Sequence, residues 1–320
     1  MNCRFVICFL VILLPVILAI PVDPQGPSHE RVKVSYCDLK KNPVAYNHKL
    51  IEVTGFVSHG FEDFTMFEPA CSSYPEVWLE YGGTAASGTM YCCGPTSARI
   101  RPKKLVVENI PVELVADERF QQFDKLVQRS PDSVVRATLV GRFFAGEEIK
   151  TPARTFRGGY GHMGCCSLLA IEQVVAVELH NSPDLDYGAW AQQPDIAKTG
   201  CGYSSLTNIT PYEASLKAQA QADRGEHDWM FTDPKRVTTE GLAELIKDDP
   251  KSIQFRQTGK WQGRFVYEWR PRGKKVTYMV VVSRPYWLSY YAKDPKRVAW
   301  VVLAAYESSC GGSNSVQRIR

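Results

Sequence analysis

Cysteine and histidine side chains carry the most reactive chemistry in this sequence. His162 stands three residues before the adjacent pair Cys165-Cys166, and a second adjacent pair is Cys92-Cys93. Thiolates and an imidazole could complete the coordination shell of a zinc ion, which would make the chain a metal-binding or redox protein. Zinc sites usually space cysteines as C-x2-C, however, and adjacent cysteines point apart in an extended chain. The spacing therefore favours disulfides and no cofactor, with the metal site as the alternative.

The cysteine count indicates a disulfide-bonded, exported protein. The chain has 320 residues and ten cysteines, which is many for a cytosolic protein. Cys3 and Cys8 belong to an N-terminal apolar segment, which leaves eight disulfide candidates: Cys37, Cys71, Cys92, Cys93, Cys165, Cys166, Cys201 and Cys310. Because a bond between adjacent cysteines strains the peptide between them, we expect the two vicinal pairs to bond each other. Cys201 and Cys310 would close the last third of the chain as a loop.

Hydrolysis is a third hypothesis. Its candidates are His59, Glu62, Asp63 and His162, which would have to converge near loops of the fold. The sequence contains no G-x-S-x-G, H-E-x-x-H, P-loop or C-x-x-C pattern. The G-x-G-x-x-G formed by residues 159–164 precedes a predicted strand rather than a helix, so it is not a dinucleotide loop, and its glycines are expected to form tight turns. A binding or structural role is therefore favoured over catalysis.

Residues 1–22 resemble a secretory signal. One arginine, Arg4, precedes an apolar run from Phe5 to Ile20, and Ala19 is a small residue near a cleavage point. An uncleaved membrane anchor is the alternative, because the segment from Phe5 to Val22 is just long enough to span a bilayer. Residues 23–30 are polar and rich in proline, which is typical of a tether. We therefore expect a periplasmic or secreted protein.

Residues 31–180 show the element order of a small β-barrel. Ser35 to Asp38 has the capping-box form, so a short helix should begin there and end before Pro43. Strands are expected at residues 50–57, with a bulge or kink at Gly55, and at 64–67, 77–81, 134–144 and 168–179. Asp117 should cap a helix that runs to about Arg129. Three strands, a helix and two strands are the order of an OB-fold, a five-stranded barrel.

Four segments of this region resemble an uncharacterised family of exported bacterial OB-fold-like proteins. They are Tyr36 to Leu39, Asp132 to Val135, Val140 to Gly146 and Gly158 to Cys166. The resemblance covers about residues 35–178. It implies a fold and a compartment, and it implies no activity.

Residues 201–320 predict an α+β domain, reached through a linker at residues 181–200 that is rich in Asp, Pro and Gln. A helix should open at Thr210-Pro211 and run to about Arg224, and a second should begin at Thr238 or Thr239. Alternation over residues 261–269 predicts one strand with a buried face. Further strands at 275–283 and 298–306 complete an antiparallel sheet.

Charge is distributed unevenly between the two predicted domains. Residues 30–180 carry 17 Lys or Arg and 18 Asp or Glu, a balance of −1 that argues against nucleic acid as a partner. Residues 200–320 carry 19 and 12, a balance of +7. We expect an anionic polymer or cell-envelope component to meet a basic face made of Arg264, Arg270, Arg272, Lys274 and Lys275. The alternative is a half-buried sheet with solvated charges on its outer face.

Overall fold

The structure is a computed structural model of the chain, and it describes residues 30–60, 63–71, 76–89, 99–128, 133–152, 155–178, 185–186, 203–205, 211–261 and 263–308. The predicted signal at residues 1–22 and nearly all of the predicted tether lie outside these ranges, as do Glu62, Cys92, Cys93, Cys201 and Cys310. Within the described part, no helix is long and apolar enough to cross a membrane.

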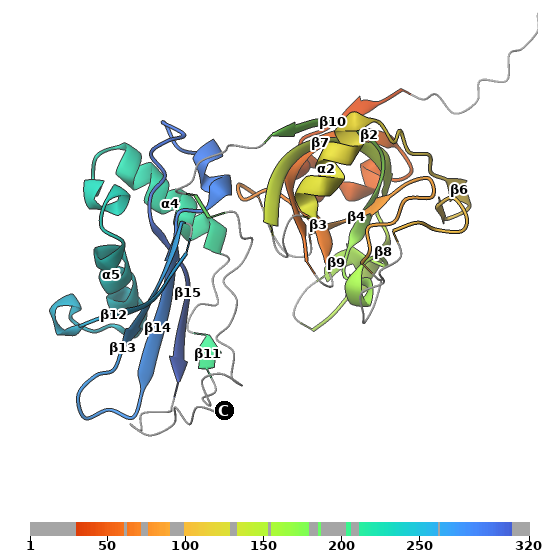
Figure 1. Cartoon of the computed structure of the whole chain (residues 1–320). Coiled ribbons are helices and arrows are strands. Elements are labelled where there is room, and N and C mark those ends of the chain that lie inside the picture. The colour runs from red at the N-terminus through yellow and green to blue at the C-terminus, as the bar shows by residue number, and fades with distance from the viewer. Residues whose placement is uncertain are drawn as a thin grey trace, which may run out of the picture. The chain divides into compact units, whose positions relative to one another are not determined.

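Five strands form a closed barrel in the N-terminal part of the chain (Figure 1). They are β2 (Leu50–His59), β3 (Phe64–Phe67), β4 (Val77–Tyr81), β7 (Ser133–Phe144) and β10 (Ser167–Glu178). The order around the barrel is β2-β3-β4-β10-β7, and β7 pairs with β2 to close it. β4 and β10 are parallel, whereas the other neighbouring pairs are antiparallel. Element order and closure confirm the predicted OB-fold-like barrel.

Alternating side chains divide each barrel strand into an inner and an outer row. On β2, Ile51, Val53 and Val57 face the barrel core, and Glu52, Thr54 and Phe56 face outward. The register of β2 against β7 runs without a shift past Gly55, so the predicted bulge is wrong. A Cβ at Gly55 would lie 2.9 Å from Met66 Cγ, and the glycine therefore allows β3 to approach β2 closely.

Two capped helices close the barrel. α1 (Tyr36–Lys41) begins at Ser35, whose hydroxyl accepts from the Asp38 amide at 3.1 Å, and ends at Asn42. α2 (Glu118–Val127) begins at Asp117, whose carboxylate accepts from the Phe120 amide at 3.0 Å. Both predicted caps are thus confirmed. Phe123 and Val127 of α2 enter the barrel core.

Several short strands and turns lie around the barrel. β1 (Val32–Lys33) runs parallel to β2, and the helical turn η1 (Pro43–Tyr46) follows α1. Two small hairpins are β5 (Val106–Val107) with β6 (Ile110–Pro111), and β8 (Glu147–Lys150) with β9 (Thr155–Gly158). The turn η2 (His162–Gly164) precedes β10. Positive φ at Gly159, Gly161 and Gly164 confirms that this glycine run forms turns.

The C-terminal part is an antiparallel sheet with helices on one face (Figure 1). Its strand order is β11 (Tyr203–Ser205), β15 (Val301–Ser308), β14 (Thr277–Ser283), β13 (Arg264–Trp269) and β12 (Arg256–Trp261). The helices α4 (Pro211–Asp223) and α5 (Pro234–Ile246) pack on this sheet. Three short turns, η3 (Asp228–Phe231), η4 (Pro250–Ser252) and η5 (Tyr286–Tyr290), complete the α+β arrangement that was predicted.

Three sequence predictions in this part are wrong. α5 begins at Pro234 rather than at Thr238 or Thr239, because Asp233 caps the Arg236 amide at 2.9 Å. Residues 261–269 do not form one strand: Gly263, at φ 61°, turns the chain between β12 and β13. Within the predicted linker, Leu185 and Asp186 are buried in the fold.

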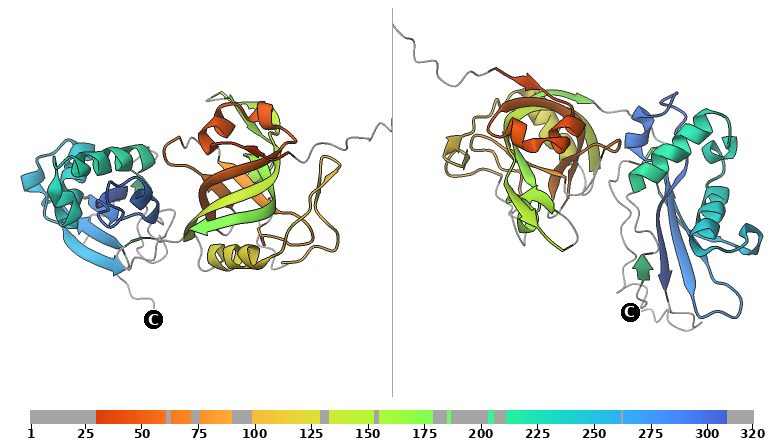
Figure 2. Two further views of the ribbon diagram at one scale, coloured as in Figure 1. Left: turned by 90° about the horizontal axis from the view of Figure 1, so that it is seen from above. Right: turned by 180° about the vertical axis from the view of Figure 1, so that it is seen from behind.

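A shared apolar cluster joins the two parts, and residues 31–320 form one compact unit. Phe56 and Phe67 come from the outer face of the barrel, and Tyr212 and Trp287 come from α4 and η5. The ring of Phe67 stacks on Tyr212 at 5.4 Å, and Tyr212 meets Trp287 edge-on at 5.1 Å. Figure 2 shows the barrel strands and the C-terminal sheet in two further views.

Candidate functional site

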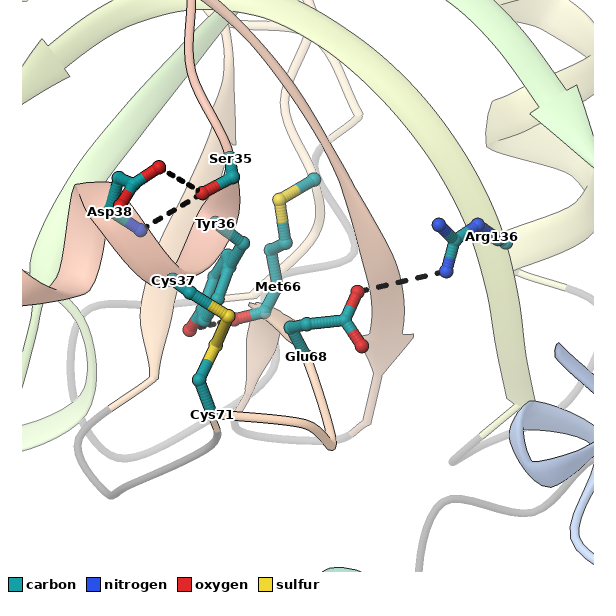
Figure 3. The surroundings of a disulfide bond; sticks show 8 residues. All are labelled: Ser35, Tyr36, Cys37, Asp38, Met66, Glu68, Cys71 and Arg136. Carbon is teal, nitrogen blue, oxygen red and sulfur yellow. Dashed lines mark hydrogen bonds and ion pairs between the residues drawn. A yellow bond between two sulfur atoms is a disulfide. The ribbon is translucent and has the colours of Figure 1, made fainter. Parts of the chain in front are cut away.

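A disulfide fixes one edge of a cavity on the barrel. Cys37 of α1 bonds Cys71, which follows β3, across 34 residues of chain (Figure 3). Beside the bond, the buried Tyr36 hydroxyl donates to the Met66 carbonyl at 2.9 Å. Together these contacts hold the start of α1 against β3.

The cavity lies over the outer face of β2 and has a volume of about 610 Å³. We name it the stapled pocket; its charged lining residues are Lys33, Glu52, Glu68 and Arg136, and its other polar and aromatic lining residues include Thr54, Tyr290 and Tyr291. On the sheet, Thr54 pairs with Thr138, and their hydroxyls are 2.8 Å apart. The volume is in the range of small-molecule sites in proteins.

Glu68 and Arg136 form the inner charged pair of the pocket. Glu68 Oε2 lies 3.6 Å from Arg136 Nη1, and Figure 3 shows the carboxylate turned toward the guanidinium. The guanidinium also lies against two neighbouring rings, 5.0 Å from the centroid of Phe56 and 4.9 Å from that of Tyr290. Aromatic contacts therefore hold Arg136 against the wall of the pocket.

The Glu68 carboxylate is incompletely compensated. Burial raises its pKa above the ordinary glutamate value, and this effect exceeds the lowering by Arg136 and by the backbone of Ala70. Its Oε1 atom is buried and makes no hydrogen bond of ordinary geometry with the described residues. The site would thus accept an additional hydrogen-bond donor or positive charge.

Glu52 supplies the second acidic group. Its side chain is 13% exposed, and it pairs with Arg31 at 3.1 Å and Lys33 at 3.3 Å. Those partners are 41% and 77% exposed, so water solvates much of their charge. Among the charged groups lining the pocket, two carboxylates and one guanidinium are half-buried, and Lys33 is exposed.

The cysteines beside His162 form a different disulfide from the one predicted. Cys165 and Cys166 bond each other, so the expectation that this pair would bond Cys92-Cys93 is wrong. Cys165 has helical backbone angles, φ −64° and ψ −27°, and its side chain is therefore not directed away from Cys166 as in an extended chain. His162 opens the η2 turn beside them. Within the described residues, no group of three His, Cys, Asp or Glu could hold a metal ion.

The hydrolase candidate His59 belongs to a different polar network. Its Nε2 lies 3.1 Å from the Ser87 carbonyl and 3.1 Å from Gln128 Nε2, and burial lowers its pKa. The buried Glu80 accepts from the Ser87 amide and hydroxyl and pairs with Arg101 at 2.7 Å. These contacts fix the backbone at the end of the barrel that α2 covers, which is a structural role. Asp63 follows the end of β2, and Glu62 lies outside the described residues.

Of the five residues predicted to form an anionic-ligand face, four are exposed and one is buried. Arg264 is buried and donates to Asp186 at 2.6 Å, because Asp186 enters the C-terminal sheet instead of lying in a linker. Arg270, Arg272, Lys274 and Lys275 are exposed along the turn between β13 and β14. We name these four residues the basic hairpin.

Sequence reasoning missed the stapled pocket. Its residues come from β2, the end of β3, β7 and η5, and no short-range pattern connects them. One signal was available: Glu52 and Thr54 are polar positions in the outer row of a strand whose inner row is apolar. That alternation marks an outward face but does not indicate what lies over it.

No family model, curated protein or solved structure matches this chain.

Proposed function

We propose that this protein is an exported, disulfide-stabilised binding module without catalytic activity, and that its stapled pocket takes a small organic cation bearing N–H donors. The main supporting observation is Glu68, a half-buried carboxylate with a raised pKa and a buried acceptor atom, Oε1, that lacks a well-formed hydrogen bond within the described residues. An amine or guanidinium would supply both the charge and the donor.

The surroundings of Glu68 support this ligand class. Glu52 adds a second carboxylate, and Tyr290 and Tyr291 add aromatic surface, on which cations bind favourably. Arg136 is held by two rings at the wall, so it orients Glu68 without neutralising both carboxylates. The Cys37–Cys71 bond supports export, because disulfides persist in oxidising compartments.

Calorimetric titration of the full-length protein with putrescine and with agmatine tests the proposal, with succinate as the anionic probe. We expect both cations to bind and succinate not to. Glu68→Gln should weaken cation binding about tenfold, the loss of roughly one charge-assisted hydrogen bond. Glu147→Gln is the matched control, because Glu147 is exposed on β8 and does not line the pocket.

The pH dependence of cation binding is an independent test of the role of Glu68. Protonation removes the charge of Glu68, and its pKa is raised, so cation binding should weaken at a higher pH than an ordinary glutamate would require. Glu68→Gln should abolish this dependence. Equal binding of succinate and putrescine, or unchanged binding in Glu68→Gln, would contradict the proposal.

The basic hairpin is a second candidate site, for an anionic polymer or envelope component. Arg270, Arg272, Lys274 and Lys275 lie within six residues of one turn, and residues 200–320 carry the positive charge of the chain. Co-sedimentation with an anionic polysaccharide, dextran sulfate, should be lost in the triple variant Arg272→Glu, Lys274→Glu and Lys275→Glu and should decline with added salt. Retained binding by the triple variant would exclude the hairpin.

A further inference from the structure

The C-terminal part holds a separate apolar cavity of about 440 Å³, between α4, α5 and β15. Its floor and walls include Trp229, Val237, Leu245, Trp300 and Val302. Trp300 is 7% exposed, and its amide donates to the Met230 carbonyl at 2.8 Å, which fixes the floor. The apolar lining and the volume match those of small-molecule sites.

Small side chains create the space between the two helices. α4 presents Ala214 and Ala218 to the cavity, where longer side chains would fill it. On the other side, Gly241 of α5 approaches β15 so closely that a Cβ would lie 2.7 Å from Val302 Cγ2. The helices are therefore anchored to the sheet, and a gap remains above it.

The rim of this cavity is acidic. Glu240 and Glu244 line it one helical turn apart on α5, and both are exposed. Glu240 lies 3.8 Å from Arg236, whose guanidinium is also held over the Trp229 ring at 4.5 Å. The cavity thus combines an apolar interior with carboxylates at its entrance.

We propose that this cavity is a binding site for a cationic amphiphile, whose single alkyl chain lies between α4 and α5 and whose head group meets Glu240 and Glu244. Burial of the chain against Trp229 and Trp300 supplies the apolar contribution. The two carboxylates favour a positive over a negative head group. The site is independent of the stapled pocket.

Three octyl compounds with one chain length and different head groups test the proposal: octyltrimethylammonium, octanol and octyl sulfate, each titrated calorimetrically below its micelle concentration. We expect affinity to fall in that order. The double variant Glu240→Gln and Glu244→Gln should reduce the preference for octyltrimethylammonium over octanol about tenfold and leave octanol binding unchanged. Glu213→Gln, an exposed charge on α4 outside the cavity, is the matched control.

A substitution that fills the cavity is the second test of the proposal. Ala214 is exposed and lines the entrance, so Ala214→Trp should block all three probes while the circular dichroism and melting temperature stay near wild type. Ala220→Trp places the same side chain on an exposed position of α4 that does not line the cavity, and should bind normally. Equal affinity for octyl sulfate and octyltrimethylammonium, or full binding by Ala214→Trp, would overturn the proposal.

Discussion

At the scale of single residues, Glu76 and Lys40 are ionisable groups outside the proposed ligand site whose pKa values are shifted by burial. Burial, reinforced by nearby Asp63, raises the pKa of Glu76 to about 7, against the lowering by Thr65 and Lys40. Burial lowers the pKa of Lys40 to about 8, against the raising effect of Glu76. Burying the charged form of Glu76 or of Lys40 lowers the free energy of unfolding, and the attraction between the two charges offsets only part of that loss.

These two groups predict an unusual dependence of stability on pH. The folded state retains the Glu76 proton up to about pH 7, whereas the unfolded state releases it near the ordinary glutamate pKa, so stability should fall between those values. Lys40 in the folded state loses its proton near pH 8, below its ordinary pKa, so stability should rise again above pH 8. Urea unfolding across this range should show a stability minimum near pH 7 to 8.

Glu76→Gln checks the assignment. The variant should be more stable than wild type at pH 8 by about 3 kcal/mol, because it removes the cost of ionising a buried carboxyl. Near pH 4 the two proteins should have similar stability. Glu147→Gln should change neither the minimum nor the slope. A wild-type profile that is flat between pH 5 and 8 would show that Glu76 is ionised without cost.

At the scale of elements, α1 depends on a covalent attachment. The helix has only six residues, which is too short to be stable by itself, and Cys37–Cys71 holds it at the entrance of the stapled pocket. The second described disulfide is different in kind: Cys165 and Cys166 are adjacent, so their bond closes no loop of chain.

Removing each disulfide should therefore have unequal effects. The double variant Cys37→Ser and Cys71→Ser should lose about 3–4 kcal/mol of unfolding free energy, from the loop-closure entropy of a 34-residue separation. It should also weaken putrescine binding, since Cys37 lines the pocket. The matched variant Cys165→Ser and Cys166→Ser should lose much less. Equal losses in denaturant unfolding would show that the stabilisation does not come from loop closure.

At the scale of the whole molecule, part of the outer face of the barrel is buried in apolar clusters. In OB-folds the second and third strands bind ligands, and here these are β3 and β4. Phe67 of β3 is covered by Tyr212, and Trp78 of β4 is buried with Phe144 and Cys166. OB-folds that bind nucleic acid expose this face, whereas here residues of the same chain cover it. The net charge of residues 30–180 is also only −1.

The shared cluster predicts that barrel and C-terminal sheet unfold together. Scanning calorimetry should show one transition for the wild type. Tyr212→Ala should remove a ring that contacts both Phe67 and Trp287, cost about 3–5 kcal/mol and separate the melting into two transitions. Tyr267→Ala, in a core belonging to the C-terminal sheet alone, should destabilise without that separation. Two transitions in the wild type would contradict the coupling.

Local signals in the sequence were enough to predict the barrel. The alternation of residues 50–57, the caps at Ser35 and Asp117 and the order of strands and helices each reflect contacts between close neighbours in the chain. One of the errors comes from a contact between distant residues. Asp186 was assigned to a linker and Arg264 to an open face, yet they form a buried pair across 78 residues. A polar residue looks solvent-exposed in sequence whenever its partner is distant.

The sequence by itself thus determined the fold class, the start of three helices and the uneven charge, because propensity, capping and periodicity act over a few residues. Only the tertiary structure decided which cysteines bond, which charges are buried and where the cavities lie. Those properties depend on groups that meet across β2, β7 and η5 or between α4, α5 and β15. Desolvation and cavity shape arise from that assembly, and no short segment of the chain contains them.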